Sequence, residues 1–304
     1  MSEYAVMPLA DYQAACDKIR EKTGKTETIK SGAMAAEIDS IQSGTTTDPS
    51  EMEEQWIRAI ERDVGKPVTK LPEGLTRIGD YAFYNYANLA LTSLPDGVTS
   101  IGNNVFGNCT DLALTSLPDG LTSIGGGAFS GCETIYLTSL PNGLTRIGAN
   151  AFYNCTNLAL TSLPNGLTGI SDSVFFGCAN LALTSLPDGV TSIGTNAFNK
   201  CTHLALTSLP DGLTSIGGNS FANCTNLALT SLPNGLTSVG NNAFYKCTNL
   251  TEITFNAKPK SIASSAFANC TNLLTINVPW AEGEVANAPW GATNATINYN
   301  YTGG

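Results

Sequence analysis

The sequence is poor in charge, and the charge that it carries is acidic. Only 13% of the 304 residues are charged, and the formal net charge is −10. We find no cluster of Lys and Arg, which argues against a nucleic acid or an anionic membrane surface as partner, because basic patches bind both. No run of 18 apolar residues occurs, so we expect no insertion into a membrane.

The beginning of the chain lacks the features of a secretory signal. Residues 1–8 contain neither a basic stretch nor an apolar core. We therefore expect either a protein that stays where it is made or one that leaves by an unrecognised route.

Residues suited to catalysis are scarce. His203 is the only histidine, and a Ser-His-Asp or Cys-His site would have to use it. It follows Cys201 by two positions, where other repeats have Asn or Asp, so we expect its side chain to be exposed. The HExxH, P-loop and Rossmann glycine patterns are absent. The sequence therefore predicts no enzyme, no cofactor and no catalytic metal.

The chain is built on one unit that recurs at a constant interval, the interval from Cys132 to Cys155. The unit reads Leu-x-Leu-x-x-Leu-Pro-(Asp/Asn)-Gly-(Leu/Val)-Thr-x-Ile-Gly-x-x-(Ala/Val)-Phe-x-x-Cys, with local changes. Nine phenylalanines keep this period from Phe83 to Phe267, and eight cysteines keep it from Cys109 to Cys270. A fixed period of this length is typical of stacked units that bury their apolar residues only against their neighbours. We predict a solenoid of nine rungs between about Val68 and Val278.

Each unit contains three kinds of local signal. The first apolar run predicts a short strand, and Leu-Thr-Ser-Ile-Gly alternates like a second one. Pro-Asp-Gly and Pro-Asn-Gly predict turns, because Pro fixes φ and Gly accepts a positive φ. Ala-Phe-x-x-Cys has helical spacing and predicts a short helical turn. The repeat cysteines share one position, which favours a ladder of buried thiols that act as small hydrophobes. A metal chain or a redox relay is the alternative, and no CxxC or nearby His supports it.

The two ends of the chain depart from the repeat. An apolar stripe predicts a helix over residues 9–22, a second short helix follows Ser31, and a third begins near Asp48. We divide the chain into a helical attachment segment (1–44), a linker with a capping helix (45–66), the repeat array (67–278) and a C-terminal cap and tail (279–304). The N-terminal helices are expected to bind copies of themselves or an assembly partner, with a frayed tail as the alternative. Trp280 and Trp290 can cover the end of the core, or form an aromatic binding site.

Two rows of side chains are candidates for binding a protein or a glycan. The first, the hydroxyl row, lies on the expected sheet face and is uncharged, with Tyr136 as the one aromatic in the adjacent Ala positions: Thr115, Tyr136, Thr138, Thr161, Thr184, Thr207 and Thr230. The alternative is that Thr favours strands and Ser is simply solvated. The second row follows the Phe ladder: Tyr84, Tyr153, Phe176 and Tyr245. Because the rungs are nearly identical, their surface fits an extended partner better than a single small ligand.

Acidic residues also recur at the turns. The row contains Glu73, Asp96, Asp119, Asp188 and Asp211, with Asn142, Asn165 and Asn234 between them. A carboxylate row could hold Ca²⁺. Turn formation explains each of these residues as well, and single carboxylates one rung apart make a poor cage.

The pattern Ile-Gly-x-x-Ala-Phe-x-x-Cys-Thr-x-Leu, as at Ile147 to Leu158, resembles the BspA-like, treponemal-type leucine-rich repeat. This resemblance implies a right-handed solenoid with a parallel sheet on one face, and a bacterial surface or secreted binding protein. The family has apolar residues three, six and eight places after Cys, whereas the middle rungs have them at three, five and eight, as in Leu158, Leu160 and Leu163. A bulge is expected there, and it leaves open which of the Ala, Thr and Ser residues face outward.

The ends of the chain are similar to another group of proteins. Met-Pro-Leu-Ala-Asp-Tyr near the N-terminus and the closing Pro-Trp-Gly-Ala-Thr-Asn-Ala-Thr-Ile-Asn-Tyr resemble segments of phage or prophage tail-associated proteins of gut Firmicutes. Our leading hypothesis is a non-enzymatic adhesion or receptor-binding protein, with a phage tail as a candidate setting. A secreted or cell-surface BspA-like adhesin and a structural spacer without ligand are the alternatives.

Overall fold

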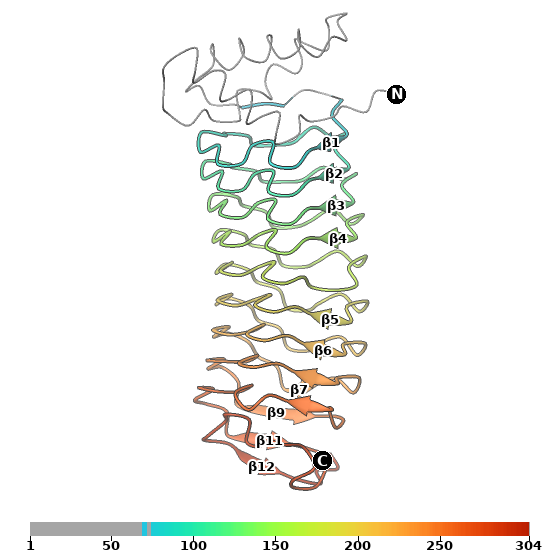
Figure 1. The fold of residues 1–304 in the computed structure, drawn as a ribbon, viewed down its shortest axis with the longest axis vertical. Helices are drawn as coiled ribbons and strands as arrows, with labels where there is room; N and C mark the ends of the chain where they lie inside the picture. Colours follow the sequence, from blue (N-terminus) through green and yellow to red (C-terminus); the bar gives the residue numbers. More distant parts are fainter. Residues whose placement is uncertain (1–68, 72–73, 304) are drawn as a thin grey trace, which may run out of the picture.

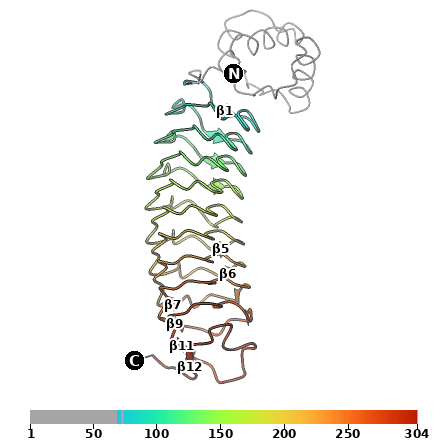
Figure 2. The ribbon, with the colours of Figure 1, turned by 90° about the vertical axis from the view of Figure 1, so that its left-hand side faces the viewer.

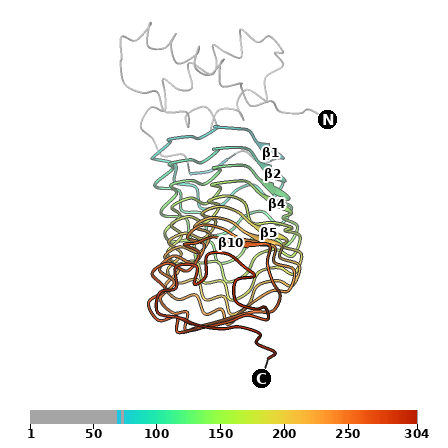
Figure 3. The ribbon, with the colours of Figure 1, turned by 60° about the horizontal axis from the view of Figure 1, so that its bottom comes forward.

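The computed structural model describes residues 69–71 and 74–303. They form a parallel β-solenoid of about ten turns, each of about 23 residues, stacked along one axis (Figure 1). Seen toward its C-terminal end, the stack repeats a similar outline turn after turn (Figure 3). The predicted repeat solenoid with a parallel sheet is confirmed. The expected N-terminal segments 1–44 and 45–66 lie outside the described residues.

The Thr-Ser-Ile segments form two sheets along one wall of the solenoid (Figures 1 and 2). The first sheet contains β1 (Arg77–Ile78), β2 (Ser100–Ile101), β3 (Ser123–Ile124) and β4 (Arg146–Ile147), in that order. The second has the order β10-β8-β6-β5 and contains β5 (Ser192–Ile193), β6 (Ser215–Ile216), β8 (Ser238–Val239) and β10 (Ser261–Ile262). Each residue pairs in parallel with the equivalent residue of the neighbouring rung, so the isoleucines stack inward and the serines and arginines outward.

A third sheet lies near the C-terminal end of the stack. It contains β7 (Ser231–Leu232), β9 (Glu252–Phe255), β11 (Thr275–Asn277) and β12 (Thr296–Asn298), in the order β12-β11-β9-β7. The prediction that the first apolar run is a strand is right only here. In the described rungs before β7 no strand forms from this run, and two exposed residues, such as Thr161 and Ser162, stand between its buried leucines. Strand β7 has the same spacing but pairs with β9, in which buried Ile253 and Phe255 alternate with outward residues.

The Ala-Phe-x-x-Cys segment is a run of tight turns, and no helix forms in the described residues. Two residues take positive φ in each segment from Phe83 to Phe244, such as Asn150 at 58° and Asn154 at 55°. Successive backbone N–H groups therefore donate their hydrogen bonds alternately within the turn and to the next rung. Tyr153 N–H donates within the turn to Asn150 O at 3.0 Å, whereas Phe152 N–H donates to Val174 O of the next rung at 2.9 Å. Left-handed residues interrupt the helical bond pattern, and each turn is bonded to the next rung instead.

Phe and Cys ladders run through the core beside these turns. Nine Phe rings, from Phe83 to Phe267, stack on one another, and Phe129 and Phe152 have ring centroids 5.3 Å apart at an interplanar angle of 8°. Each repeat cysteine donates its thiol proton to a Phe carbonyl of the preceding rung, as Cys155 Sγ does to Phe129 O at 3.0 Å. The prediction of buried, free thiols is confirmed for the eight repeat cysteines. Burial raises the pKa of Cys109 and of Cys270 to about 12.

The C-terminal tail adds one further turn beyond Val278. Trp290 stands one repeat period after Phe267, whose N–H donates to Trp290 O at 2.9 Å. Both indoles are buried and pack on Phe255, with centroid distances of 5.5 Å for Trp280 and 5.9 Å for Trp290. Strand β12 then pairs with β11. The indoles therefore belong to the core, and the capping role of residues 279–304 remains a prediction. Within the described residues, no helix has the length and hydropathy to cross a membrane.

Candidate binding surfaces

The hydroxyl row is exposed along the solenoid, but most of it does not lie on a hydrogen-bonded sheet. All of its predicted members are exposed: Thr115, Tyr136, Thr138, Thr161, Thr184, Thr207 and Thr230. Tyr136 is 53% exposed and is the most open aromatic side chain described. In the middle rungs, both Thr and the following Ser face outward, while the preceding Ala, such as Ala159, is half-buried. The question left by the sequence is thus answered: Thr and Ser form the surface together.

The second aromatic row is discontinuous. Tyr153 and Phe176 stack at 4.7 Å with an interplanar angle of 6°, and the Lys200 ammonium lies 5.1 Å from the Phe176 ring centroid. Tyr245 is separate, with Lys246 Nζ 5.3 Å from its ring centroid. Tyr84 lies near the N-terminal end of the array. Its ring packs over Gly107, where a Cβ would lie 2.7 Å from the Tyr84 ring. The structure therefore brings together two of the four predicted residues.

The remaining candidates of the sequence occupy exposed positions. His203 is exposed, and its Nδ1 lies 2.7 Å from Ala179 O. Asp96, Asp119 and Asp188 are exposed at their turns, and Glu73 lies outside the described residues. In the described part of the chain, no group of three or more His, Cys, Asp or Glu side chains is placed to hold a metal ion.

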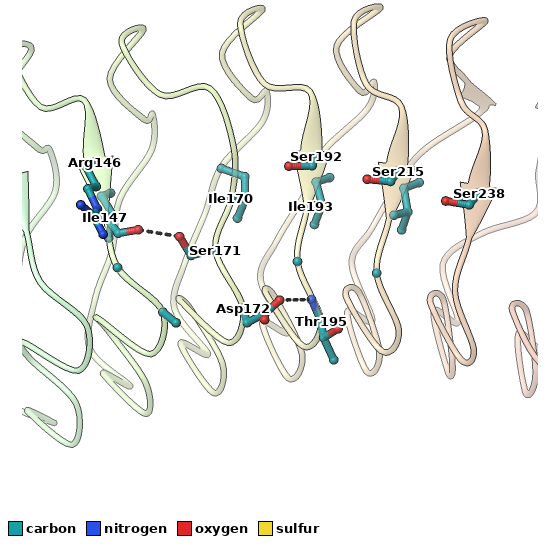
Figure 4. A pocket seen from close by; sticks show the side chains of 15 residues that line it. Arg146, Ile147, Ile170, Ser171, Asp172, Ser192, Ile193, Thr195, Ser215 and Ser238 are labelled. Carbon is teal, nitrogen blue, oxygen red and sulfur yellow. Dashed lines mark hydrogen bonds between the residues drawn. The ribbon is translucent and has the colours of Figure 1, made fainter.

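A cleft that the sequence analysis missed interrupts the wall formed by the first two sheets. It lies between β4 and β5 and has a volume of about 590 Å³ (Figure 4). The rung at residues 168–172 carries no strand here, and only an isolated bridge joins Ile170 to Ile193. A smaller hollow of about 250 Å³ lies over the junction itself, which we call the seam: the contact between residues 145–148 and residues 168–171.

Ser171 accounts for the seam. Most other rungs have Gly at its position, and a Cβ at Gly217, for example, would lie 2.7 Å from the backbone of the preceding rung. The Ser171 hydroxyl donates to Ile147 O at 2.6 Å. At the junctions on either side, a backbone N–H fills this role: Gly148 donates to Ile124 O at 2.9 Å, and Gly194 to Ile170 O at 2.8 Å. The hydroxyl therefore replaces the backbone donor.

A comparison within the chain separates the hydroxyl from the Cβ. Ala263 also has a Cβ at this position, yet its N–H donates to Val239 O at 3.0 Å and β10 pairs normally with β8. A Cβ alone is therefore tolerated at that junction. The seam differs from that junction in the Ser171 hydroxyl, which competes with the backbone N–H for the Ile147 carbonyl oxygen. Strand pairing is lost where this hydroxyl is present.

The seam leaves backbone donors unused. Thr145 N–H donates to Thr122 O at 3.0 Å and Thr191 N–H donates to Thr168 O at 3.0 Å, but Thr168 N–H has no partner among the described residues. The same holds for the N–H groups of Ile147 and Ser171. Gly169, at a position where other rungs have Ser or Arg, adds no side chain to cover them. Ser171 and Gly169 were the signals in the sequence, and both stood out only against the repeat.

Two charged side chains flank this cleft. Arg146 extends from β4 on one side and is exposed (Figure 4). Asp172 follows the seam on the other side, and its Oδ1 accepts a hydrogen bond from Thr195 N–H at 2.7 Å. No described residue forms an ion pair with either of them. The cleft thus offers a cation, a carboxylate oxygen and free backbone donors on one polar surface.

Comparison with known proteins agrees with this fold. The family described as BspA type leucine-rich repeat region (6 copies) matches residues 76–205 and 170–287. The chain belongs to the BspA-type leucine-rich repeat family. A search of curated proteins gave no match.

Solved structures include other leucine-rich repeat proteins. A leucine-rich repeat protein from Bacteroides ovatus is 26% identical with a TM-score of 0.61, and the match covers 76% of this BspA-type chain and 60% of that one. The T. pallidum leucine-rich repeat protein is 27% identical, with a TM-score of 0.43 and coverage of 68% and 82%. A leucine-rich cell surface protein from Faecalibacterium prausnitzii is 23% identical, with a TM-score of 0.43 and coverage of 78% and 88%. This BspA-type chain therefore spans 60% of the length of the B. ovatus protein.

Proposed function

We propose that this protein is a non-enzymatic binding protein whose exposed hydroxyl row contacts an extended protein or glycan. The observation that carries the proposal is the row itself, a surface of uncharged Thr and Ser that repeats once per rung, with Tyr136 beside it. Hydroxyl groups both donate and accept hydrogen bonds. Many weak contacts along one partner add up through multivalency.

Tyr136 is the strongest single candidate for a contact residue. It replaces the half-buried Ala of other rungs, and its ring is 53% exposed. Tyrosine is enriched at the residues that dominate binding energy, because it combines a rigid apolar ring with a hydroxyl. The neighbouring Thr115, Thr138 and Thr161 are exposed and can surround such a contact with polar groups.

Two settings for this binding protein remain in the proposal. Membership of the BspA-type family supports a cell-surface or secreted adhesin. A phage or prophage tail is supported by the resemblance of the terminal segments alone. In that setting, residues 1–44 attach the array to an assembly of identical or different chains. Tail genes beside the coding gene would favour the second setting, and cell-wall genes the first.

The test is a binding screen of the intact protein against bacterial cells and a glycan array. We expect Tyr136→Ala to weaken binding and the double variant Thr161→Lys and Thr184→Lys to weaken it more, by desolvation and crowding. The matched control is Thr110→Lys with Thr156→Lys, which places the same charges at exposed positions next to the cysteines. Equal binding of the row variant and the wild type would exclude the row as the site. Absence of any partner would favour the spacer.

A further inference from the structure

The sequence departs from its own repeat most clearly at the seam. Arg146 replaces the usual Ser, Gly169 removes that side chain altogether one rung later, Ser171 replaces Gly, and Asp172 places a carboxylate in the following position. All four line the cleft or the smaller hollow that adjoins it (Figure 4). Identical rungs present the same surface at every level, so they provide no unique site for a small ligand. A group of sequence changes on one face provides such a site.

The cleft contains donors suited to a carboxylate. The Arg146 guanidinium has no hydrogen bond or ion pair with another described residue, and this planar group can hold a carboxylate through two parallel hydrogen bonds. The N–H groups of Thr168 and Ser171 lie unpaired beside it. The other arginine at this sheet position, Arg77, is on β1, where the backbone ladder to β2 is intact.

The other side of the cleft is suited to hydroxyl groups. One Asp172 oxygen is held by Thr195 N–H, which leaves Oδ2 without a described partner and able to accept from a ligand hydroxyl. Ser192, Ser215 and Ser238 continue along the cleft at successive rungs, so their hydroxyls recur at about 4.8 Å. A purely anionic ligand would be repelled by Asp172, whereas a ligand with one carboxylate and several hydroxyls meets both sides.

We propose that the cleft between β4 and β5 binds a carboxylated saccharide, with its carboxylate on Arg146 and the seam N–H groups and its hydroxyls on Asp172 and the serine row. The volume of about 590 Å³ is in the range of small-ligand sites, about 300–1,000 Å³. Uronic acids and sialic acids share this chemistry. The site is separate from the hydroxyl row and does not depend on the function proposed for it.

The test is isothermal titration calorimetry of the full chain at low salt. The probes are trigalacturonic acid and sialyllactose, with lactose as the neutral counterpart. We expect one of the two acidic sugars to bind and lactose to bind far more weakly. Arg146→Ser should reduce the affinity about tenfold or more, because a charge-assisted pair is lost. The matched control Arg77→Ser removes the same side chain from a rung without a seam and should leave the affinity within about twofold.

A second pair of variants tests the seam itself. Ser171→Gly restores the residue of most other rungs, so the N–H groups of residues 168 and 171 should bond to the preceding rung and become unavailable. Hydrogen exchange of the Thr168 amide should then slow, and acidic-sugar affinity should fall about tenfold. Ala263→Gly at the equivalent position of β10 should change neither.

Three results would overturn the proposal. The first is that neither acidic sugar binds. The second is that binding survives both Arg146→Ser and a Ser171→Gly variant whose Thr168 amide is protected. The third is that poly-glutamate binds through Arg146 while the acidic sugars do not, which would make the ligand a peptide. Loss of binding at the hydroxyl row leaves all three measurements unchanged, so the two proposals fail independently.

Discussion

Replacing Phe198 by Ala removes a ring from the middle of the Phe ladder. The Phe198 side chain is fully buried, and its ring stacks on Phe175 at 5.7 Å and on Phe221 at 5.5 Å. Truncation of a buried Phe to Ala costs about 3–5 kcal/mol, which combines lost burial with the remaining cavity. Because each rung contacts only its neighbours, this cost falls on two rung interfaces at once.

The end of the ladder provides the matched comparison. Phe83 is 2% exposed, and among the described residues its ring stacks on Phe106 alone, at 5.5 Å. Phe83→Ala should therefore destabilise the array less than Phe198→Ala, by about one ring pair or ~0.5–1.5 kcal/mol. Phe198→Leu keeps most of the buried volume and should cost less than Phe198→Ala, since the cavity is smaller.

The measurement is urea unfolding of the three variants and the wild type. Circular dichroism follows the whole array, and fluorescence measured in a Trp56→Phe background follows its C-terminal end through the buried Trp280 and Trp290. In Phe198→Ala, the two signals should separate if the weakened interfaces divide the array. Equal losses for Phe83→Ala and Phe198→Ala, or a loss below about 1 kcal/mol for Phe198→Ala, would refute nearest-neighbour stacking as the source of stability.

Three further predictions concern the thiols and the N-terminal segment. Thiol labelling of the native protein should be slow at the repeat cysteines and fast at Cys16; rapid labelling of several repeat cysteines before unfolding would contradict their burial. Burial raises the thiol pKa, to about 12 for Cys109 and Cys270, so the folded chain keeps protons that the unfolded chain loses. Stability should therefore be complete below about pH 8.5 and fall as the pH rises toward about 12, whereas a flat unfolding midpoint over this range would argue against the shift. Removal of residues 1–44 should leave cooperative melting of the array intact and change only its assembly, as light scattering would show; loss of cooperative melting would place these residues in the core.

The core could be predicted from the sequence because its Phe and Cys rows keep one residue type from Phe83 to Phe267 and from Cys109 to Cys270. Phe and Cys recur at the same fixed period, and identical side chains at one period must lie above one another in a stack. The turns at Pro-Asp-Gly followed from local chemistry. The tail was harder, because Trp290 stands at the Phe position but is preceded by Pro289 and lacks the neighbouring Ala of the repeat.

The surface could be predicted less completely. The Ala-Phe-x-x-Cys spacing indicated helical geometry, but Asn and Gly at two flanking positions, as at Asn150 and Asn154, take positive φ and turn alternate N–H groups toward the next rung. The spacing of Ala, Phe and Cys alone does not predict the direction in which these N–H groups point. The cleft was missed for another reason: Ser171 is unremarkable as a single residue, and its effect arises from competition for one carbonyl oxygen of a neighbouring rung.

The directions of the backbone bonds have a consequence for the electrostatics of the stack. On the Phe-turn wall, the N–H groups that cross between rungs point toward the C-terminal end, as from Phe152 to Val174. On the sheet wall, the crossing N–H groups of the Thr and Gly rows point toward the N-terminal end, as from Thr122 to Thr99. The peptide dipoles of the two walls therefore oppose each other, whereas in an α-helix all the dipoles add along the axis. The opposed rows cancel much of the partial charge that aligned dipoles would leave at the two ends of the stack, so an ionic surface approaching either end meets a weaker field than at the end of an α-helix.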